Sequence, residues 1–308
     1  MATSVLYGIT YPDGSTEGSL KSVRAIFGYG YTTGSFSITN KVNNLGGVST
    51  DTTGVGTARR DLAAAGYGGD KAIFGYGYTT AAVSMTNLVS NTGVVGADVT
   101  GVGTAKRMLA SAGYGGDKAI FGYGWEFSIY SMTNLVSNTG VVGSDVTGVG
   151  TARGALAAAG YGGDKAIFGY GTTTAASVSM TNLVSNTGVV SADTTGVGTG
   201  REELAAAGYG GDKAIFGYGF NFNLQVKYSL TNLVSNTGVV STDTTGVGTA
   251  RIRLAAAGYG GDKAIFGYGF TTGAVSMTNL VSNTGVVGSD VTGVGTARYY
   301  LASASYSS

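Results

Sequence analysis

The chain repeats one segment six times, and this repeat constrains the fold more than any other feature. Its fullest form reads GYGGDKAIFGYG at residues 66–77. A fixed period of this length is the signature of a repeat architecture. The 308 residues are therefore expected to form one array of six units rather than two unrelated domains. The Ile of the segment recurs 47, 47, 47, 48 and 50 residues apart, at Ile26, Ile73, Ile120, Ile167, Ile215 and Ile265.

Composition favours a packed structure with little charge. The chain contains 56 Gly, but 43% of its residues are hydrophobic, which argues for a core rather than for disorder. It has no Cys and no His, so disulfides, thiolate or imidazole catalysis and ordinary zinc sites are excluded. The formal net charge is +1 and 11% of residues are charged, so no nucleic-acid partner held through phosphate contacts is expected. We also expect no cofactor and no bound metal.

The N-terminal sequence carries no recognisable targeting signal. Residues 1–22 begin MATSVLYG, without the basic and apolar regions of a signal peptide, so synthesis in a cytoplasm is expected. No 18-residue apolar stretch occurs, and membrane insertion is not expected. Residues 1–22 are interpreted as an N-terminal arm or as an extra strand.

Each unit is predicted to contain four short antiparallel strands. Gly68, Gly69 and Asp70 suit a hairpin turn, because Gly tolerates positive φ and Asp favours turns. Four short strands in about 47 residues are typical of one blade of a β-propeller. In the second unit the predicted strands cover residues 62–67, 72–76, 83–89 and 94–95.

The two ends of the repeat array complete each other. Residues 301–308 align with 62–69, and residues 23–26 align with 70–73. One end would thus supply the first strand of a blade and the other end the remaining strands, which removes free sheet edges. We predict an all-β, six-bladed propeller of four-stranded antiparallel blades over residues 23–308, closed by this composite blade. The expected blades are 298–308 with 23–57, then 58–104, 105–151, 152–199, 200–249 and 250–297.

The unit resembles the kelch repeat. Thr57-Ala58-Arg59, the small strand after it, and residues 70–77 (DKAIFGYG) are similar to the kelch order of an Arg, a small apolar strand, a turn and a strand that ends in paired glycines. Here Tyr76 separates those glycines, and the late Trp of kelch repeats is absent. The uniformity of the units is also similar to repeats in phage and marine viral structural proteins. This second resemblance implies a virion-associated protein.

Two windows vary between the copies, and almost nothing else does. The first follows each Ile-Phe-Gly-Tyr-Gly and holds all the length differences, and the second is a pair of residues after each Thr-Ala-Arg-like segment. In an up-and-down blade both windows would lie at one face of the disc, and the invariant turns at the other. A uniform scaffold with one diverse face is typical of recognition surfaces. The pairs of the second window are 60–61, 107–108, 154–155, 202–203, 252–253 and 299–300.

Aromatic and charged residues in these windows are the candidate ligand or partner site. Aromatic side chains are common anchors at interfaces and on sugar-binding surfaces. The alternative is drift, since exposed loops vary when nothing restrains them. The candidates are Trp125, Glu126, Phe127, Tyr130, Phe220, Phe222, Lys227, Tyr228, Arg107, Glu202, Arg253, Tyr299 and Tyr300.

Catalysis is not expected, and no catalytic residue is assigned. The common Ser or Cys triads need a His, and a glycosidase needs two carboxylates at one site. Only four Glu occur, and the side chains of Glu202 and Glu203 would point to opposite sides of a strand. The six repeated Asp residues are interpreted as turn caps and hydrogen-bond acceptors between blades. They are Asp51, Asp98, Asp145, Asp193, Asp243 and Asp290.

The sequence therefore predicts a non-enzymatic binding or assembly module. The most concrete form is a tail-fibre or capsid-surface protein that contacts a host glycan, or a protein partner in a larger assembly, through its aromatic face. One alternative is a structural ring that docks by its invariant face. Another is an idealised repeat scaffold without a ligand.

Overall fold

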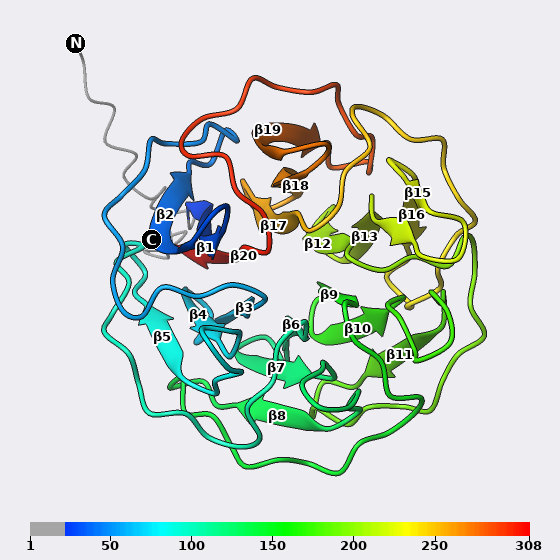
Figure 1. Ribbon diagram of the computed structural model, residues 1–308, viewed down its shortest axis with the longest axis horizontal. Coiled ribbons are helices and arrows are strands. Elements are labelled where there is room, and N and C mark those ends of the chain that lie inside the picture. Colours follow the sequence, from blue (N-terminus) through cyan, green and yellow to red (C-terminus); the bar gives the residue numbers. More distant parts are fainter. Residues whose placement is uncertain (1–21) are drawn as a thin grey trace, which may run out of the picture.

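The computed structural model describes residues 22–308, and every regular element in that range is a β-strand. Six three-stranded antiparallel sheets are arranged around a common axis (Figure 1). A two-stranded hairpin, β14 (Phe220–Asn221) and β15 (Val226–Lys227), extends one loop. The described residues contain no helix that could span a membrane. The predicted arm or extra strand at residues 1–22 lies outside the described residues, except for Ser22.

Each sheet runs outward from the axis as an inner, a middle and an outer strand. The first five sheets in chain order are β3 (Ala63–Tyr67), β4 (Lys71–Gly75) and β5 (Thr86–Val89); β6 (Ala110–Tyr114), β7 (Lys118–Gly122) and β8 (Thr133–Val136); β9 (Ala157–Tyr161), β10 (Lys165–Gly169) and β11 (Thr181–Val184); β12 (Ala205–Tyr209), β13 (Lys213–Gly217) and β16 (Thr231–Val234); and β17 (Ala255–Tyr259), β18 (Lys263–Phe270) and β19 (Ala274–Val281).

The sixth sheet joins the two ends of the described chain. It consists of β20 (Ala302–Ser307), β1 (Val23–Tyr31) and β2 (Ser35–Val42). β20 pairs antiparallel with β1 in an unbroken register from Val23↔Ser307 to Gly28↔Ala302. β20 also contacts the inner strands on both sides, β17 and β3. The inner strands therefore touch one another in a cycle that includes both ends of the array.

The prediction of a fourth strand in each sheet is wrong. The segment after the outer strand makes only isolated bridges, for example Val89↔Val95 and Thr86↔Val99. Asn87 explains the difference, because its side-chain amide donates to Gly96 O at 3.0 Å and to Asp98 Oδ1 at 2.9 Å. A side chain thus holds this Gly- and Thr-rich segment in place of a continuous backbone ladder.

Small residues in the inner strands let six strands approach the axis. In β3, Ala63, Ala65 and Tyr67 are buried between sheets, and the alternate residues Ala64 and Gly66 are partly exposed. Such alternation follows from the period of two in a strand. A Cβ at Gly66 would lie 3.2 Å from the carbonyl oxygen of Ser305 in the neighbouring inner strand, so glycine permits this close approach.

A tyrosine at positive φ follows the Ile-Phe-Gly of each middle strand and packs the core between sheets. Tyr76 has φ 62° and is fully buried. Its ring lies 5.2 Å from the ring of Phe121 in the next sheet, centroid to centroid. The equivalent Tyr–Phe contact recurs between all six pairs of neighbouring sheets. The Tyr column of the repeat therefore serves packing between sheets.

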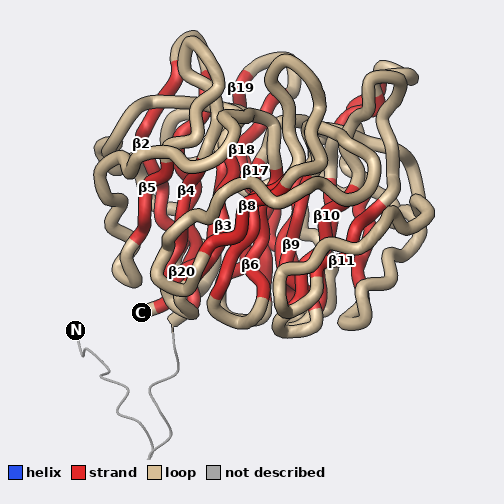
Figure 2. Tube along the Cα trace, turned by 90° about the horizontal axis from the view of Figure 1, so that it is seen from below, coloured by secondary structure: helices blue, strands red, loops and turns tan. Residues whose placement is uncertain are grey.

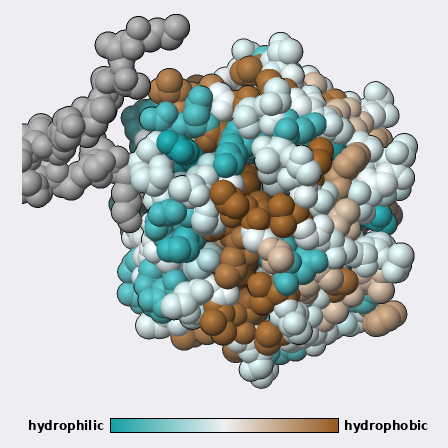
Figure 3. Space-filling model, turned by 90° about the vertical axis from the view of Figure 1, so that its left-hand side faces the viewer, coloured by the Kyte–Doolittle hydropathy of each residue, from teal (hydrophilic) through white to brown (hydrophobic). Residues whose placement is uncertain are grey.

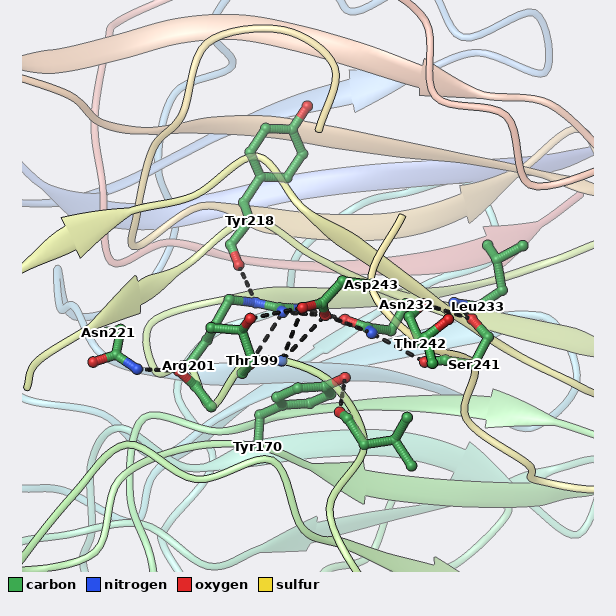
Figure 4. Close-up of polar contacts among 12 residues, drawn as sticks. Tyr170, Thr199, Arg201, Tyr218, Asn221, Asn232, Leu233, Ser241, Thr242 and Asp243 are labelled. Atoms are coloured by element: carbon green, nitrogen blue, oxygen red, sulfur yellow. Dashed lines mark hydrogen bonds and ion pairs between the residues drawn. The ribbon is translucent and has the colours of Figure 1, made fainter. Parts of the chain in front are cut away.

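A buried cation ties each sheet to the connecting segment and to its neighbour (Figure 4). Arg201 donates to the carbonyl oxygen of Tyr218 at 2.9 Å and to Asn232 Oδ1 at 2.6 Å. Its guanidinium lies over the ring of Tyr170 and 3.4 Å from Asp243. Burial opposes ionisation of Asp243, but hydrogen bonds from Thr199 and Asn232 hold its pKa below the usual value. The repeated Asp residues are thus acceptors that link consecutive units.

The third repeat, residues 105–151, departs from this pattern, because Lys106 replaces the arginine. Its Nζ donates to Asn134 Oδ1 at 2.8 Å and lies 5.1 Å from the centre of the Tyr76 ring. No ion pair joins it to Asp145. Burial lowers the pKa of Lys106 to about 8. Of the six buried cations, Lys106 alone makes no ion pair with the repeated Asp.

Candidate functional site

The structure brings the two variable windows together at one end of the ring. The first residue of each loop window pairs with the first residue of a pair window in an isolated bridge, for example Arg60↔Tyr78 and Arg107↔Trp125. Figure 2 shows these loops projecting at one end, with the C terminus at the other. We call the end that carries both windows the variable face. The other four bridges are Tyr31↔Tyr299, Gly154↔Thr172, Glu202↔Phe220 and Ile252↔Phe270.

A cycle of six backbone hydrogen bonds surrounds the axis on this face. The N–H of Asp61 donates to the carbonyl of Tyr300 at 3.0 Å, and the N–H of Met108 donates to that of Asp61 at 2.9 Å. Ala155, Glu203, Arg253 and Tyr300 continue the series until it returns to its start. All six residues have φ between 51° and 58°, which L-residues rarely adopt. The cycle fixes the backbone while leaving each side chain free to differ.

Aromatic and cationic side chains alternate in an unbroken row around much of the variable face. Arg60 lies over the rings of Tyr31 and Tyr78, at 4.4 and 4.9 Å from their centres. Arg107 lies over Tyr78 at 4.4 Å and over Trp125 at 5.0 Å. We call this row, with the two residues that extend it, the aromatic belt. Its members are Phe270, Tyr299, Tyr31, Arg60, Tyr78, Arg107 and Trp125.

Ring contacts extend the belt on the side of Tyr31. The ring of Tyr299 lies 5.7 Å from that of Tyr31 and 5.1 Å from that of Phe270. Lys227 ends the row, with Nζ 5.1 Å from the centre of the Phe270 ring and donating to the carbonyl of Thr271. The belt thus joins predicted site residues from loops far apart in sequence. Stacking of this kind holds flat, amphipathic side chains in fixed orientations.

Each arginine in the belt, and Arg253 beside it, has a carboxylate partner. Arg107 Nε lies 3.4 Å from Glu126, and Arg60 Nε lies 3.6 Å from Asp61. Arg253 Nε donates to Glu203 Oε1 at 2.9 Å. Each pair sets a carboxylate beside a guanidinium group. In the Arg60–Asp61 pair the compensation is partial near neutral pH, because burial raises the pKa of Asp61 to about 7. The face therefore offers ring surfaces and hydrogen-bonding groups with little surplus charge.

Trp125 is the most open ring of the belt. Its side chain is 39% exposed. The next repeat has Gly154 where Arg60 and Arg107 stand in theirs, and a Cβ there would lie 3.5 Å from Trp125 Cβ. No side chain at that position covers the far side of Trp125, in contrast to Tyr78, which lies between two arginines.

The other predicted site residues lie on the same face but not in the belt. Phe127 and Phe222 protrude, with 95% and 59% of their surface exposed. Tyr130 and Tyr228 are half-buried at the ends of their loops, where each N–H donates to a glycine carbonyl at 2.8 Å. Glu202 is buried, and burial raises its pKa. Phe220 pairs with Lys227 in the β14–β15 hairpin and is half-buried.

The sequence analysis missed Tyr31, Arg60, Tyr78 and Phe270 as site residues. A signal was present, since the first position of the loop window is aromatic in five of six copies and Thr172 in the remaining one. The long loops supply the protruding phenylalanines Phe127 and Phe222. The short loops carry most of the belt.

A small well of about 80 Å³ opens at the axis within the backbone cycle. Six leucines from Leu62 to Leu301 contribute to its lining, together with the six residues of the cycle. Asp61 is only 5% exposed, and its Oδ1 has no hydrogen-bond partner among residues 22–308. Burial raises the pKa of Asp61 to about 7, although Arg107 and Arg60 act to lower it.

The opposite end, which we call the uniform face, carries the repeated turns. Gly68 N donates to Asp117 O at 2.7 Å, and this bond recurs from unit to unit until Ser307 N donates to Asp70 O at 2.9 Å. A funnel of about 400 Å³ opens here around the axis. Its rim carries five Lys–Asp pairs between adjacent residues, such as Lys71–Asp70 at 2.7 Å. The funnel is larger than the axial well, but its lining is nearly the same in every unit.

The outer circumference exposes aliphatic side chains. Val94, Val141, Val189, Val239 and Val286 are each 60–66% exposed after the second turn of their units. Figure 3 shows apolar side chains gathered in a band down one side of the ring. Among residues 22–308, no cluster of three or more Asp and Glu side chains could hold a metal ion.

No family model matches the sequence, and no curated protein matches it.

Proposed function

We propose that the protein is a six-bladed β-propeller of kelch-like repeats and that it binds a neutral carbohydrate through the aromatic belt. The observation that supports the binding proposal most directly is the belt itself. Seven stacked side chains from four sheets present ring faces on the one end of the molecule where the repeats differ. Sugars bind by packing their apolar C–H faces on such rings, while polar groups beside the rings fix their orientation.

The charge balance of the face supports a neutral ligand. Every arginine in or beside the belt already lies near a carboxylate. An anionic ligand would have to compete with Glu126, Glu203 or Asp61, and a cationic ligand with the arginines. Hydroxyl groups can both donate to and accept from such pairs without separating them. Catalysis has no part in this proposal, and a location on a virion surface stays a prediction.

The test is glycan binding by matched variants. We expect the protein to bind a subset of neutral oligosaccharides on a glycan array, and Trp125→Ala to lower the affinity for them at least tenfold by calorimetry. Removing an exposed side chain should leave the free energy of unfolding within about 0.5 kcal/mol. Val141→Ala, which trims an apolar side chain that is 66% exposed far from the belt, is the control and should change neither quantity. Absence of any array signal, or equal affinity of Trp125→Ala and wild type, would refute the proposal.

A second candidate is docking of the uniform face onto a larger assembly. The 400 Å³ funnel is the observation that favours it. This candidate would be supported by a partner that protects Gly68–Asp70 from hydrogen exchange, or that cross-links to these residues, while the belt stays accessible.

A further inference from the structure

The axial well on the variable face differs from the rest of the inner wall. Elsewhere around the axis the units repeat nearly the same small residues, but the six side chains of the backbone cycle are all different. Going around the cycle, Met108 and Ala155 form an apolar arc, and Glu203, Arg253, Tyr300 and Asp61 form a polar arc. The leucines beneath make the floor apolar. The well is therefore amphipathic and has one polar side.

The polar arc is only partly satisfied. Glu203 Oε1 accepts hydrogen bonds from Arg253 Nε at 2.9 Å and from the Tyr300 hydroxyl at 3.2 Å. Arg253 also lies over the ring of Tyr300 at 4.5 Å. Asp61 faces Glu203 from three positions away in the six-membered cycle, which is the opposite side of the axis. Its Oδ1 remains buried without a donor from residues 22–308.

A buried carboxylate oxygen without a hydrogen-bond donor is unfavourable. The charged groups around Asp61 limit which kind of ligand could donate to its Oδ1. Arg60 approaches the other oxygen, Oδ2, at 3.6 Å rather than Oδ1. Arg107 and Arg253 also act on Asp61, and only Glu203 opposes them, so the field around the well does not favour an added cation. A neutral group with an O–H donor would satisfy Oδ1 and rest against the apolar arc.

Resting on the proposed function, we propose that the axial well receives one end of the bound saccharide, with a hydroxyl donating to Asp61 Oδ1. The volume of about 80 Å³ holds a few non-hydrogen atoms, which suits a hydroxymethyl group or one edge of a pyranose rather than a whole ring. Tyr299 links the two sites, because its ring contacts both Tyr300 at the well and Tyr31 in the belt. A sugar chain would enter the well end-on and continue along the belt.

Methionine labelling gives a direct test. Met108 lines the well, and Met85, Met132, Met180 and Met277 occupy one equivalent position outside it in four repeats. With ¹³C-methyl methionine, titration with methyl glucoside, methyl galactoside and methyl mannoside should shift the Met108 signal saturably for at least one sugar. The signals of these four residues should not move. Met108→Leu assigns the signal.

The variant Asp61→Ala isolates the proposed hydrogen bond. Ala155 adopts the same backbone conformation at the equivalent position, with φ 51°, so alanine is compatible with the fold. We expect Asp61→Ala to weaken binding of the active methyl glycoside at least tenfold, and Val141→Ala, which lies far from both the well and the belt, to leave this monosaccharide response unchanged. A Met108 signal that responds to no sugar, or equally in Asp61→Ala and wild type, would overturn the inference. A response to methylammonium instead of the sugars would also overturn it and assign an ammonium site.

The two proposals can fail separately. If oligosaccharide binding depends on Trp125 but not on Asp61, the belt stands and the axial well does not. If no glycan binds and no methyl glycoside moves Met108, the proposed function and the inference fall together.

Discussion

The variable and uniform faces are built from the same kind of backbone cycle but use it differently. On the uniform face the donor is a glycine in five units, such as Gly68 at φ 64°, and the turns around it scarcely change. On the variable face the donors are six different residues, all held at positive φ without glycine. A cycle that needs only backbone groups leaves its side chains free to vary. Diversity is therefore concentrated where the backbone alone supports the structure.

Opening both backbone cycles at once should have the largest effect on stability. Deleting residues 298–308 removes the buried Arg298, strand β20, Tyr300 from the variable-face cycle and Ser307 from the uniform-face cycle. We expect loss of the cooperative thermal transition, because β1 then becomes a free edge and one sheet loses its inner strand. Adding the peptide 298–308 should restore the transition. An unchanged melting temperature in a monomeric truncated protein would show that neither cycle matters.

The pH dependence of stability should distinguish the variable face from the uniform face at a single carboxylate, Asp61. The pKa of Asp61 is about 7 in the folded state and 3.8 as a free group, so the folded state prefers the protonated form. Its contribution is favourable below pH 3.8 and is lost as the pH rises through about 7. Asp61→Asn should therefore raise the free energy of unfolding by about 2–3 kcal/mol at pH 8 and have little effect at pH 4. Chemical denaturation at both pH values measures this.

The matched carboxylate on the uniform face, Asp117, should not give the stabilisation expected for Asp61. Hydrogen bonds from Lys118 and Asn138 hold the pKa of Asp117 below its usual value. Asp117→Asn should therefore not stabilise the protein at pH 8. Equal responses at Asp61 and Asp117 would remove the proposed distinction between the faces. Arg60, Arg107, Glu203 and Arg253 are the charged groups that act on Asp61 and are retained in this comparison.

A smaller change in stability is expected on substitution of the buried Lys106. Burial lowers its pKa to about 8 from 10.5, so the unfolded state binds the proton more strongly and stability rises between these pH values. Lys106→Arg should stabilise the protein by about 1–3 kcal/mol at pH 7, and the gain should shrink toward pH 10.5. The reverse change Arg153→Lys, in the next repeat, should destabilise and introduce the same pH dependence. If both changes are silent, the six cation sites are equivalent.

The repeat itself allowed much of the architecture to be predicted. The positions of the inner and middle strands follow from small residues, hairpin glycines and alternation, and in the second unit they differ from the structure by at most one residue at each end. The outer segment was misassigned because the sequence does not reveal that the Asn87 side chain replaces a backbone ladder. The location of both windows at one face followed from strand direction. The belt did not, because cation–π stacking between Arg60 and Tyr31 depends on which units are neighbours in space.

The axial well could not be predicted from the sequence either. Asp61 and Glu203 were visible as isolated charges in the pair window. Their facing positions arise only when the backbone cycle returns to its start. The burial of Asp61 depends on the neighbours that this closure supplies.

The serines of β20 have a further consequence for how the chain avoids assembling wrongly. Ser305 Oγ donates to Gly258 O at 2.7 Å, and Ser307 Oγ donates to Gly69 O at 3.4 Å. The other inner strands carry glycine at the position of Ser305 and cannot form that bond. Six near-identical strands offer many competing partners for β1 during folding, including those of a second molecule. The hydroxyl groups bond to the units on either side of β20, so they favour placing β20 between β17 and the turn at Gly69, and with it ring closure within one chain over strand exchange.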